Sequence, residues 1–203
     1  MLSHPTNSST EQTLRDYLVK LYPDVLSWGE KNREGIVHRL DRVTSGLMVC
    51  ALNLDSFNNL KGKFKNRDIQ KKYIALIQGT LPSETGIIKL PLARSIQNRS
   101  KRIVAQKGRL SITNYEVKYF DHSSNISKTE LELVTGRNHQ IRAHMEHMKT
   151  PVVNDTLYGA SKNNLIPTDS IALHSASLKF NFDNEVHSFE TNEPSFFNRV
   201  LDV

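Results

Sequence analysis

The chain has 203 residues, of which 37% are hydrophobic and 24% charged, enough for one globular domain with a core. Lys and Arg outnumber Asp and Glu by 27 to 21, and this basic excess is compatible with a polyanionic partner. The single cysteine, Cys50, excludes a disulfide within the chain, no apolar run approaches the roughly 20 residues that span a membrane, and the first residues lack a signal-peptide pattern. We therefore expect a cytoplasmic protein without a membrane segment.

The first part of the chain is predicted to contain two helices and three strands. The first helix places Leu14, Leu18 and Leu21 on one face, and Pro23 ends it. The predicted elements are a helix over Thr10–Leu21, strands over Ile36–Leu40 and Leu47–Leu52, a helix over Asp55–Phe64 and a strand over Lys71–Gly79.

The rest of the chain is mostly short strands, with one further helix that Asn138 is predicted to cap and that runs to about Met148. Because helices interrupt the strands irregularly, we expect an α+β fold on a mixed, mostly antiparallel sheet. The predicted strands are Gly86–Leu90, Arg102–Gln106, Arg109–Phe120, Lys128–Val134, Ile171–Phe182 and Glu185–Glu190.

Asp41 is the first candidate for a functional residue, because it stands between Arg39 and Arg42 at the predicted end of a strand. A Thr-Ser-Gly turn and an apolar run follow it, so the carboxylate should lie at the rim of the core. There it needs a charged partner, and nearby cations favour its ionised form. These local features leave two roles open: a structural salt bridge, or a nucleophile, base or electrostatic anchor.

A second candidate region is the segment "TGRNHQIRAHMEH", in which a strand, a glycine turn and a helix follow one another. Arg142 lies in the first turns of that helix, and we predict that it reaches back towards Asp41. The alternative for Gln140 and His144 is that both form hydrogen bonds with the backbone at the start of the helix.

The same segment raises a competing hypothesis, a metal-dependent hydrolase with zinc bound by His139, His144 and His147. Two arginines, Arg137 and Arg142, intrude on that cluster, and neither a cysteine pair nor a His-Glu-x-x-His spacing is present. The residue types therefore argue against a metal site.

Two further features are compatible with a nucleic-acid partner. Tyr73 lies in an apolar predicted strand, where it is either an ordinary core residue or a surface on which a base stacks. A basic segment, either a solvated loop or a surface that follows phosphates, contains Arg94, Arg99, Lys101, Arg102, Lys107 and Arg109.

Four motifs together resemble the RluA-type pseudouridine synthase family. They are "HRLDRVTSGLMVCALN", "KKYIALIQG", "TGRNHQIRAHM" and "LHSASLKF", and they extend over nearly the whole chain. The resemblance implies the family's bifurcated sheet with flanking helices and a central catalytic cleft. The sequence lacks the family's opening Asn-Lys-Pro strand and an S4 domain, so we expect a single catalytic domain over 1–203 without that strand.

The resemblance also implies roles for individual residues. Asp41 matches the family's essential aspartate. Tyr73 matches the tyrosine that packs against the target uracil and is a candidate base late in the reaction. Arg142 matches the arginine that pairs with the carboxylate. Arg39 matches the arginine that fills the space left by the extruded uridine. The remaining residues expected to contact RNA are His38, Arg137, His139, Gln140, Arg94 and Arg102.

The implied reaction isomerises uridine to pseudouridine in ribosomal or transfer RNA, by exchanging the C1′–N1 bond for a C1′–C5 bond. Substrate and product are isomers, so we expect no cofactor and no metal, and we expect a monomer. The point at which Asp41 acts, C1′, C6 or C2′, stays open. One departure is Val43, which stands where the family usually has an acid. The alternative function is a non-catalytic RNA-binding relative that lost turnover with its first strand.

Overall fold

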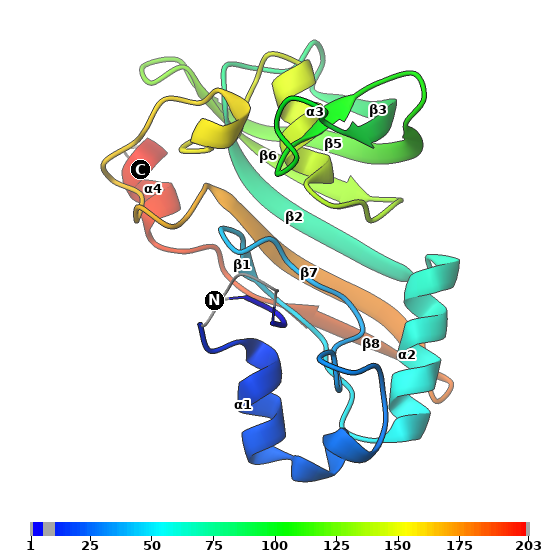
Figure 1. The fold of residues 1–203 in the computed structure, drawn as a ribbon. Helices are drawn as coiled ribbons and strands as arrows, with labels where there is room; N and C mark the ends of the chain where they lie inside the picture. Colours follow the sequence, from blue (N-terminus) through cyan, green and yellow to red (C-terminus); the bar gives the residue numbers. More distant parts are fainter. Residues whose placement is uncertain (1, 6–10, 202–203) are drawn as a thin grey trace.

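The computed structural model describes residues 2–5 and 11–201, which form one eight-stranded sheet with helices around it (Figure 1). The strand order is β1-β7-β2-β6-β5-β3-β4, with β8 also paired to β7. Every strand pair except β1 with β7 is antiparallel, which confirms the predicted α+β class. The strands are β1 (Ser45–Gly46), β2 (Ile69–Gln78), β3 (Thr85–Arg94), β4 (Arg102–Val104), β5 (Arg109–Asp121), β6 (Ile126–Leu133), β7 (Leu173–Phe182) and β8 (Glu185–Glu190).

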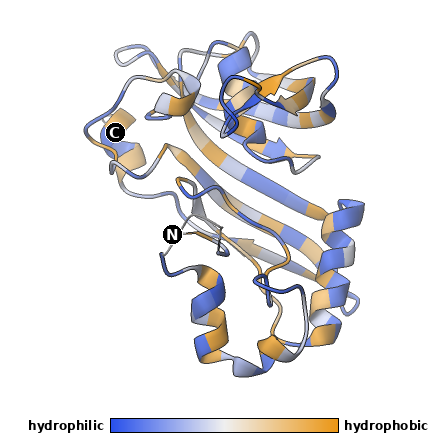
Figure 2. Cartoon of the chain, in the orientation of Figure 1, coloured by the Kyte–Doolittle hydropathy of each residue, from blue (hydrophilic) through white to orange (hydrophobic). Residues whose placement is uncertain are grey.

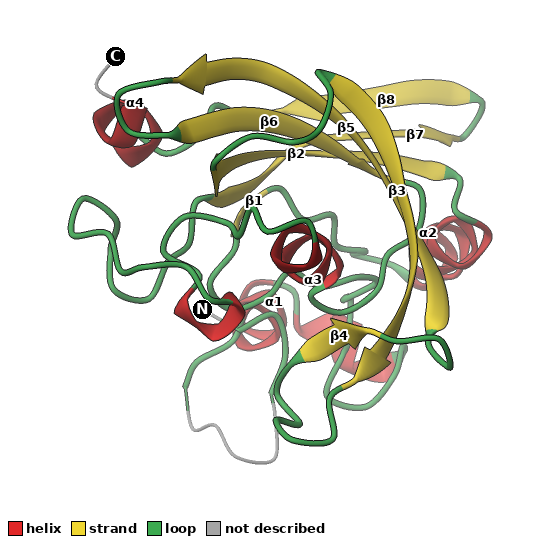
Figure 3. Cartoon of the chain, turned by 90° about the horizontal axis from the view of Figure 1, so that it is seen from above, coloured by secondary structure: helices red, strands yellow, loops and turns green. Residues whose placement is uncertain are grey.

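The sheet is strongly curved, and α3 lies on its concave side (Figure 3). The concave face holds the main core, while ion pairs such as Lys72–Glu130 lie on the other face. The half of β2 next to α2 is hydrophilic and the other half is hydrophobic (Figure 2). The helices are α1 (Leu14–Leu21), α2 (Leu54–Asn66), α3 (Gln140–His147) and α4 (Phe196–Leu201), with 3₁₀ turns at Pro23–Ser27 and Thr156–Tyr158. Within the described residues, every helix is too short or too polar to cross a bilayer.

The predicted strands over Ile36–Leu40 and Leu47–Leu52 are wrong. Apart from one bridge between Ile36 and Cys50, the only strand in this region is the two-residue β1. The reason is that β8 pairs with β7 from Ser177 onward, which leaves only His174 and Ser175 of β7 to pair with β1. The apolar side chains are still needed, because Val37, Leu47 and Val49 pack against a second core formed with α2 and β7.

The helix predictions need smaller corrections. The predicted start at Thr10 lies outside the described residues, and α1 begins at Leu14, after a capping box between Thr13 and Asp16. Of the three leucines predicted to share one face of this helix, only Leu18 is buried, and Leu21 is 69% exposed. Asn138 is not the cap of α3: the cap position is taken by His139 in a left-handed conformation (φ 53°), without a side-chain capping bond. Neither α4 nor β1 is among the elements that the sequence pattern predicted.

Candidate active site

A pocket of about 560 Å³ opens between the loop around Asp41, the hydrophilic half of β2 and the segment that leads into α3. Its volume is within the range of small-molecule sites in proteins. The described residues that line it include seven cationic side chains and one acid, Asp41. The cations are Arg39, Lys65, Arg67, Lys71, Arg109, Arg137 and Arg142.

The Asp41 loop is held in place by its backbone and by the core. The Thr44 amide donates to the Asp41 carbonyl (2.9 Å), and the Ile171 amide donates to the Val43 carbonyl (3.1 Å). Leu40 and Val43 pack against the main core. The Asp41 side chain, 14% exposed, is therefore presented to the pocket from a fixed turn rather than from the end of a strand.

Arg142 supplies the cationic partner of Asp41, as the sequence predicted. Its Nη1 lies 3.3 Å from Asp41 Oδ2. Its Nε and Nη2 donate to Asp155 at 2.6 and 2.9 Å, so the guanidinium is held by a fork of two hydrogen bonds. Burial lowers the pKa of Arg142, but the hydrogen bonds and charge of Asp155, together with the charge of Asp41, outweigh burial and raise it. The cation is therefore fixed before any substrate binds.

The two arginines that flank Asp41 in the sequence, Arg39 and Arg42, do not pair with it. Arg42 forms an ion pair with Glu11 at 2.6 Å on the surface. Arg39 is exposed, and its Nη1 lies 3.4 Å from His4 Nε2. The prediction that the flanking arginines are the cations that keep Asp41 ionised is therefore corrected. Its cationic partner, Arg142, lies 101 residues away in the sequence.

His139 and Tyr158 complete the surroundings of Asp41. His139 Nε2 lies 3.8 Å from Asp41 Oδ2, and its Nδ1 lies 2.9 Å from the Tyr158 hydroxyl. Burial lowers the pKa of His139, and the opposing charge of Asp41 is the smaller effect. The Tyr158 oxygen also accepts from the Arg102 amide (2.8 Å). When the hydroxyl donates to Nδ1, the proton of the neutral imidazole sits on Nε2 and faces Asp41.

Tyr73 lies on the concave face of β2 and is 7% exposed; it belongs to the main core and also lines the pocket. Burial raises the pKa of Tyr73 to about 12, and the charge of Asp41 acts in the same direction. The phenol is therefore neutral at physiological pH. The flat ring of Tyr73 suits packing against a base. This role and that of a base late in the reaction both stay predictions.

Gln140 and His38 line the pocket but also hold the loops around it. The Gln140 amide accepts from Thr135 Oγ1 and the Arg137 amide and donates to the Ile112 carbonyl and Thr113 Oγ1, all within 3.0 Å. His38 Nε2 accepts from the Val49 amide, and the ring stacks on Phe64 at 4.4 Å between centroids. The bonds of Gln140 bear out the backbone role weighed for it at the start of α3.

Arg94 and Arg102 do not line the pocket. Both lie in the β3–β4 hairpin, where Arg94 Nε donates to the Arg99 carbonyl (2.7 Å). Their contact with RNA stays a prediction. Arg137, in contrast, lines the pocket beside Asn138 and His139.

The three histidines of the zinc hypothesis do not converge. His139 faces Asp41, whereas His144 is buried against Thr113, with 3.0 Å between Nδ1 and Oγ1. The neighbouring Glu146 pairs with Lys101 instead. Across the part of the chain that the structure describes, His, Cys, Asp and Glu do not gather in threes as a metal ion would require.

Sequence reasoning missed three residues of the pocket region: Asp155 as the second partner of Arg142, Tyr158 as the link to His139, and Lys71. Asp155 is 1% exposed and follows the buried pair Val152 and Val153. An acid two residues after a buried apolar pair is a signal that could have identified it. The Tyr158 ring stacks under Arg142 at 4.8 Å, and nothing in its local sequence indicates that contact.

Comparisons with known proteins agree on one family. The sequence model described as RNA pseudouridylate synthase matches residues 1–147. An uncharacterized RNA pseudouridine synthase of Chloroflexus aurantiacus is 39% identical over 81% of this chain and 51% of its own length. Ribosomal large subunit pseudouridine synthase D of Vibrio parahaemolyticus is 34% identical over 87% of this chain and 56% of its own. The chain thus spans about half the length of the curated relatives it matches.

A solved structure shows the same fold. Human RNA Pseudouridylate Synthase Domain Containing 1 superposes with a TM-score of 0.73 at 26% sequence identity, and the match covers 96% of this chain and 84% of the human one.

Proposed function

Because the chain belongs to the RNA pseudouridylate synthase family, we propose that it isomerises uridine to pseudouridine in RNA, with Asp41 as the essential carboxylate. The observation that carries the proposal is the composition of the pocket. A single acid, fixed by a buried arginine, faces a cavity whose other charged walls are cationic. A polyanion that offers one neutral base to that acid fits such a site.

Each residue of the pocket has a separate role in the proposed reaction. A uridine in folded RNA is extruded into the pocket, at a cost of a few kcal/mol. Arg39, exposed at the mouth, takes the space that the base leaves. Tyr73 lies flat beside the uracil, and Asp41 acts as nucleophile or base while Arg142 keeps it ionised and oriented. C1′–N1 breaks and C1′–C5 forms, C5 loses its proton and N1 gains one, so atoms and electrons balance without a redox partner or a second substrate.

The proposed target is a uridine of large-subunit ribosomal RNA, and the support for it is the name of the Vibrio parahaemolyticus relative. A transfer RNA is the second class of target. We place the reaction in the cytoplasm, where ribosomal RNA is assembled, and we propose that a monomer carries it out without metal. A single chain supplies every group assigned here to the reaction.

The test uses unmodified transcripts of the host's ribosomal and transfer RNAs, incubated with the purified protein. Mass spectrometry should find pseudouridine at one or a few uridines, and Asp41→Asn, which is nearly isosteric, should produce none. Binding without any pseudouridine in either RNA class would overturn the enzymatic proposal and favour a non-catalytic RNA-binding relative.

A further inference from the structure

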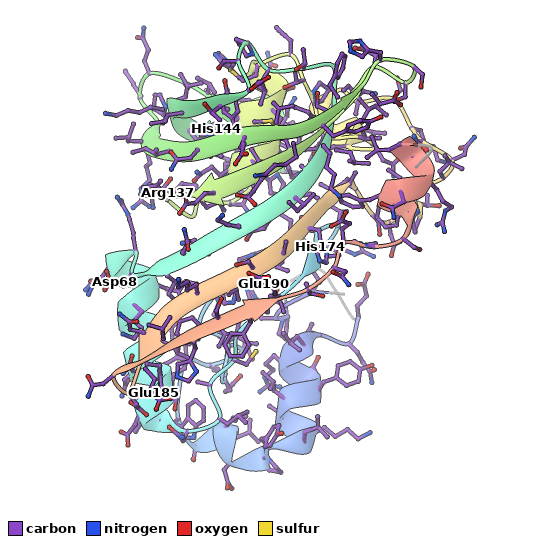
Figure 4. The ribbon with its side chains drawn as sticks, turned by 180° about the vertical axis from the view of Figure 1, so that it is seen from behind. Asp68, Arg137, His144, His174, Glu185 and Glu190 are labelled. Carbon is purple, nitrogen blue, oxygen red and sulfur yellow. The ribbon has the colours of Figure 1, made fainter. Side chains whose placement is uncertain are left out.

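The end of the pocket remote from Asp155 gathers four cations from four different elements. We call Arg67, Lys71, Arg109 and Arg137 the four-cation cluster. Arg67 follows α2 in a left-handed conformation (φ 70°), Lys71 lies on β2, Arg109 begins β5, and Arg137 precedes α3. Figure 4 shows Arg137 beyond the tip of β6, and Asp68, next to Arg67, at the α2 end of β2.

The members of the cluster are close enough to repel one another. Burial lowers the pKa of Arg137, and the charges of Arg109 and Arg67 lower it further. Burial likewise lowers the pKa of Lys71, and Arg67 adds to the effect. Like charges at close range cost free energy in the folded state, which a bound anion would offset.

Lys71 is the most constrained member. It is 7% exposed, yet its ammonium group forms no hydrogen bond or ion pair with any residue the structure describes. The one carboxylate that favours its charge, Glu132, already accepts hydrogen bonds from Gln70 and Asn114. Arg137 adds a second incomplete group, because its Nε is buried without a partner among the described residues. Cations that line a pocket without a paired acid are partly desolvated, and a bound anion would offset that cost.

We propose that the four-cation cluster binds a phosphodiester group of the RNA strand that delivers the uridine to Asp41. The inference rests on the proposed function and deepens it. Lys71 and Tyr73 are two residues apart on the same face of β2, which separates them by about 7 Å along the strand. A phosphate held by Lys71 therefore belongs to the nucleotide whose base lies against Tyr73, or to its neighbour.

The chain offers a matched pair of variants. Lys71→Met keeps the long unbranched side chain and removes the charge inside the pocket. Lys72→Met makes the same change one residue later, where the lysine points to the opposite face of the sheet and pairs with Glu130 at 2.8 Å. RNA affinity is measured against salt concentration for both. Lys71→Met should weaken binding about tenfold at low salt and reduce the slope of log K against log[salt] by about 0.7 to 0.9, the contribution of one phosphate.

Lys72→Met should leave both quantities unchanged. Lys71→Met should also unfold at the same temperature as the wild type or a higher one, because it removes a partly desolvated cation that also lies near Arg67. A lower unfolding temperature would instead indicate a structural salt bridge and overturn the proposal. Arg109→Gln, at an exposed member of the cluster, provides a second variant with little risk to folding and should lose affinity in the same direction.

The phosphate itself is identified with RNA that carries one uncharged methylphosphonate linkage at successive positions around the target uridine. At one position, the uncharged linkage should weaken binding of the RNA to the wild type. The same substitution should not weaken binding to Lys71→Met any further. Inorganic phosphate and uridine monophosphate serve as competitors, and competition by either at low concentration would point to a free anion instead of the RNA backbone. A scan with no such linkage, or equal salt slopes for Lys71→Met and Lys72→Met, overturns the proposal.

The outcome is separable from that of the proposed function, because binding is measured without turnover. A changed salt slope without pseudouridine would retain the phosphate site and reject the enzyme. Pseudouridine formation by the wild type, with the same salt slope for Lys71→Met as for the wild type, would retain the enzyme and reject the phosphate site.

Discussion

The two ends of the pocket handle charge in opposite ways. At the Asp41 end, Arg142 is shared between Asp41 and the fully buried Asp155, so each charge has an opposite one within hydrogen-bonding reach. At the Lys71 end, the four-cation cluster has no paired acid among the described residues. Charges that the protein pairs are fixed in position, which suits a group that must act on a substrate at a set point. Charges left unpaired are available to a ligand.

The largest effect expected from this contrast is that of Asp41→Asn. Turnover should fall by about 10³-fold or more, because the amide is neither nucleophile nor base. The dissociation constant for RNA should stay within a few-fold of the wild type, since phosphate contacts at the other end of the pocket are intact. Single-turnover pseudouridine formation and filter binding measure the two quantities. Asp169→Asn, an exposed acid nearby, is the control and should keep its turnover. Near-normal turnover by the Asp41 variant would remove the carboxylate from the mechanism.

The next effect concerns the paired end. Arg142→Met leaves Asp155, 1% exposed, as a buried carboxylate without its cation, and should lower the free energy of unfolding by about 3–5 kcal/mol as well as reduce turnover. The double variant Arg142→Met/Asp155→Leu removes both charges and should recover part of that loss. Urea unfolding measures both.

The control for the Arg142 variant is Lys61→Met. Lys61 pairs with Glu30 at 2.7 Å on the surface, and its loss should cost less than about 1 kcal/mol. Equal losses for the buried and exposed pairs would contradict the view that Arg142 is a buried, fixed charge.

The sequence predicted most of the sheet because β2, β5, β6 and β8 carry their own patterns. The segment around Asp41 has an equally apolar sequence, yet it forms almost no strand. The cause of this difference lies outside the segment. β8 pairs with the edge of β7 that the segment would need, so its apolar residues pack against the core from a loop. A pattern of apolar residues therefore does not determine strand pairing by itself, because pairing also depends on which sheet edge is free.

The same distinction explains the site. The contact between Arg142 and Asp41 was accessible because both motifs stand out in the sequence. Asp155 and Lys71 were missed because their importance depends on burial. In "KKYIAL", Lys71 lines the pocket and Lys72 lies on the surface. In the sequence, only the alternation of strand residues relative to Tyr73 distinguishes the two lysines.

A smaller effect connects the cluster to pH. Burial, and then the charge of Lys71, lowers the pKa of His38 to about 4, against about 6.5 in the unfolded chain. Between these values the unfolded state binds the proton and the folded state does not, so stability falls as pH drops from 6.5 towards 4. His38→Gln should reduce that fall by about 1–2 kcal/mol. Urea unfolding at pH 7, 5.5 and 4.5 measures it, and His144, whose pKa burial lowers to about 4 as well, should account for some of the remaining slope. Identical pH dependence in the variant and the wild type would contradict a neutral His38 in the folded protein.

The smallest effect is expected at the arginine next to Asp41 in the sequence. Arg42 pairs with Glu11 on the surface, where both side chains are largely exposed. Arg42→Gln should therefore change the free energy of unfolding by less than about 1 kcal/mol and leave turnover unchanged. Arg39→Gln is the comparison, because Arg39 lines the pocket. Removal of its charge should lower kcat/KM about tenfold. If Arg42→Gln lowered kcat/KM as much as Arg39→Gln, the neighbours of Asp41 would matter for its charge after all. The pairing with Arg142 would then not be the sole control of the carboxylate.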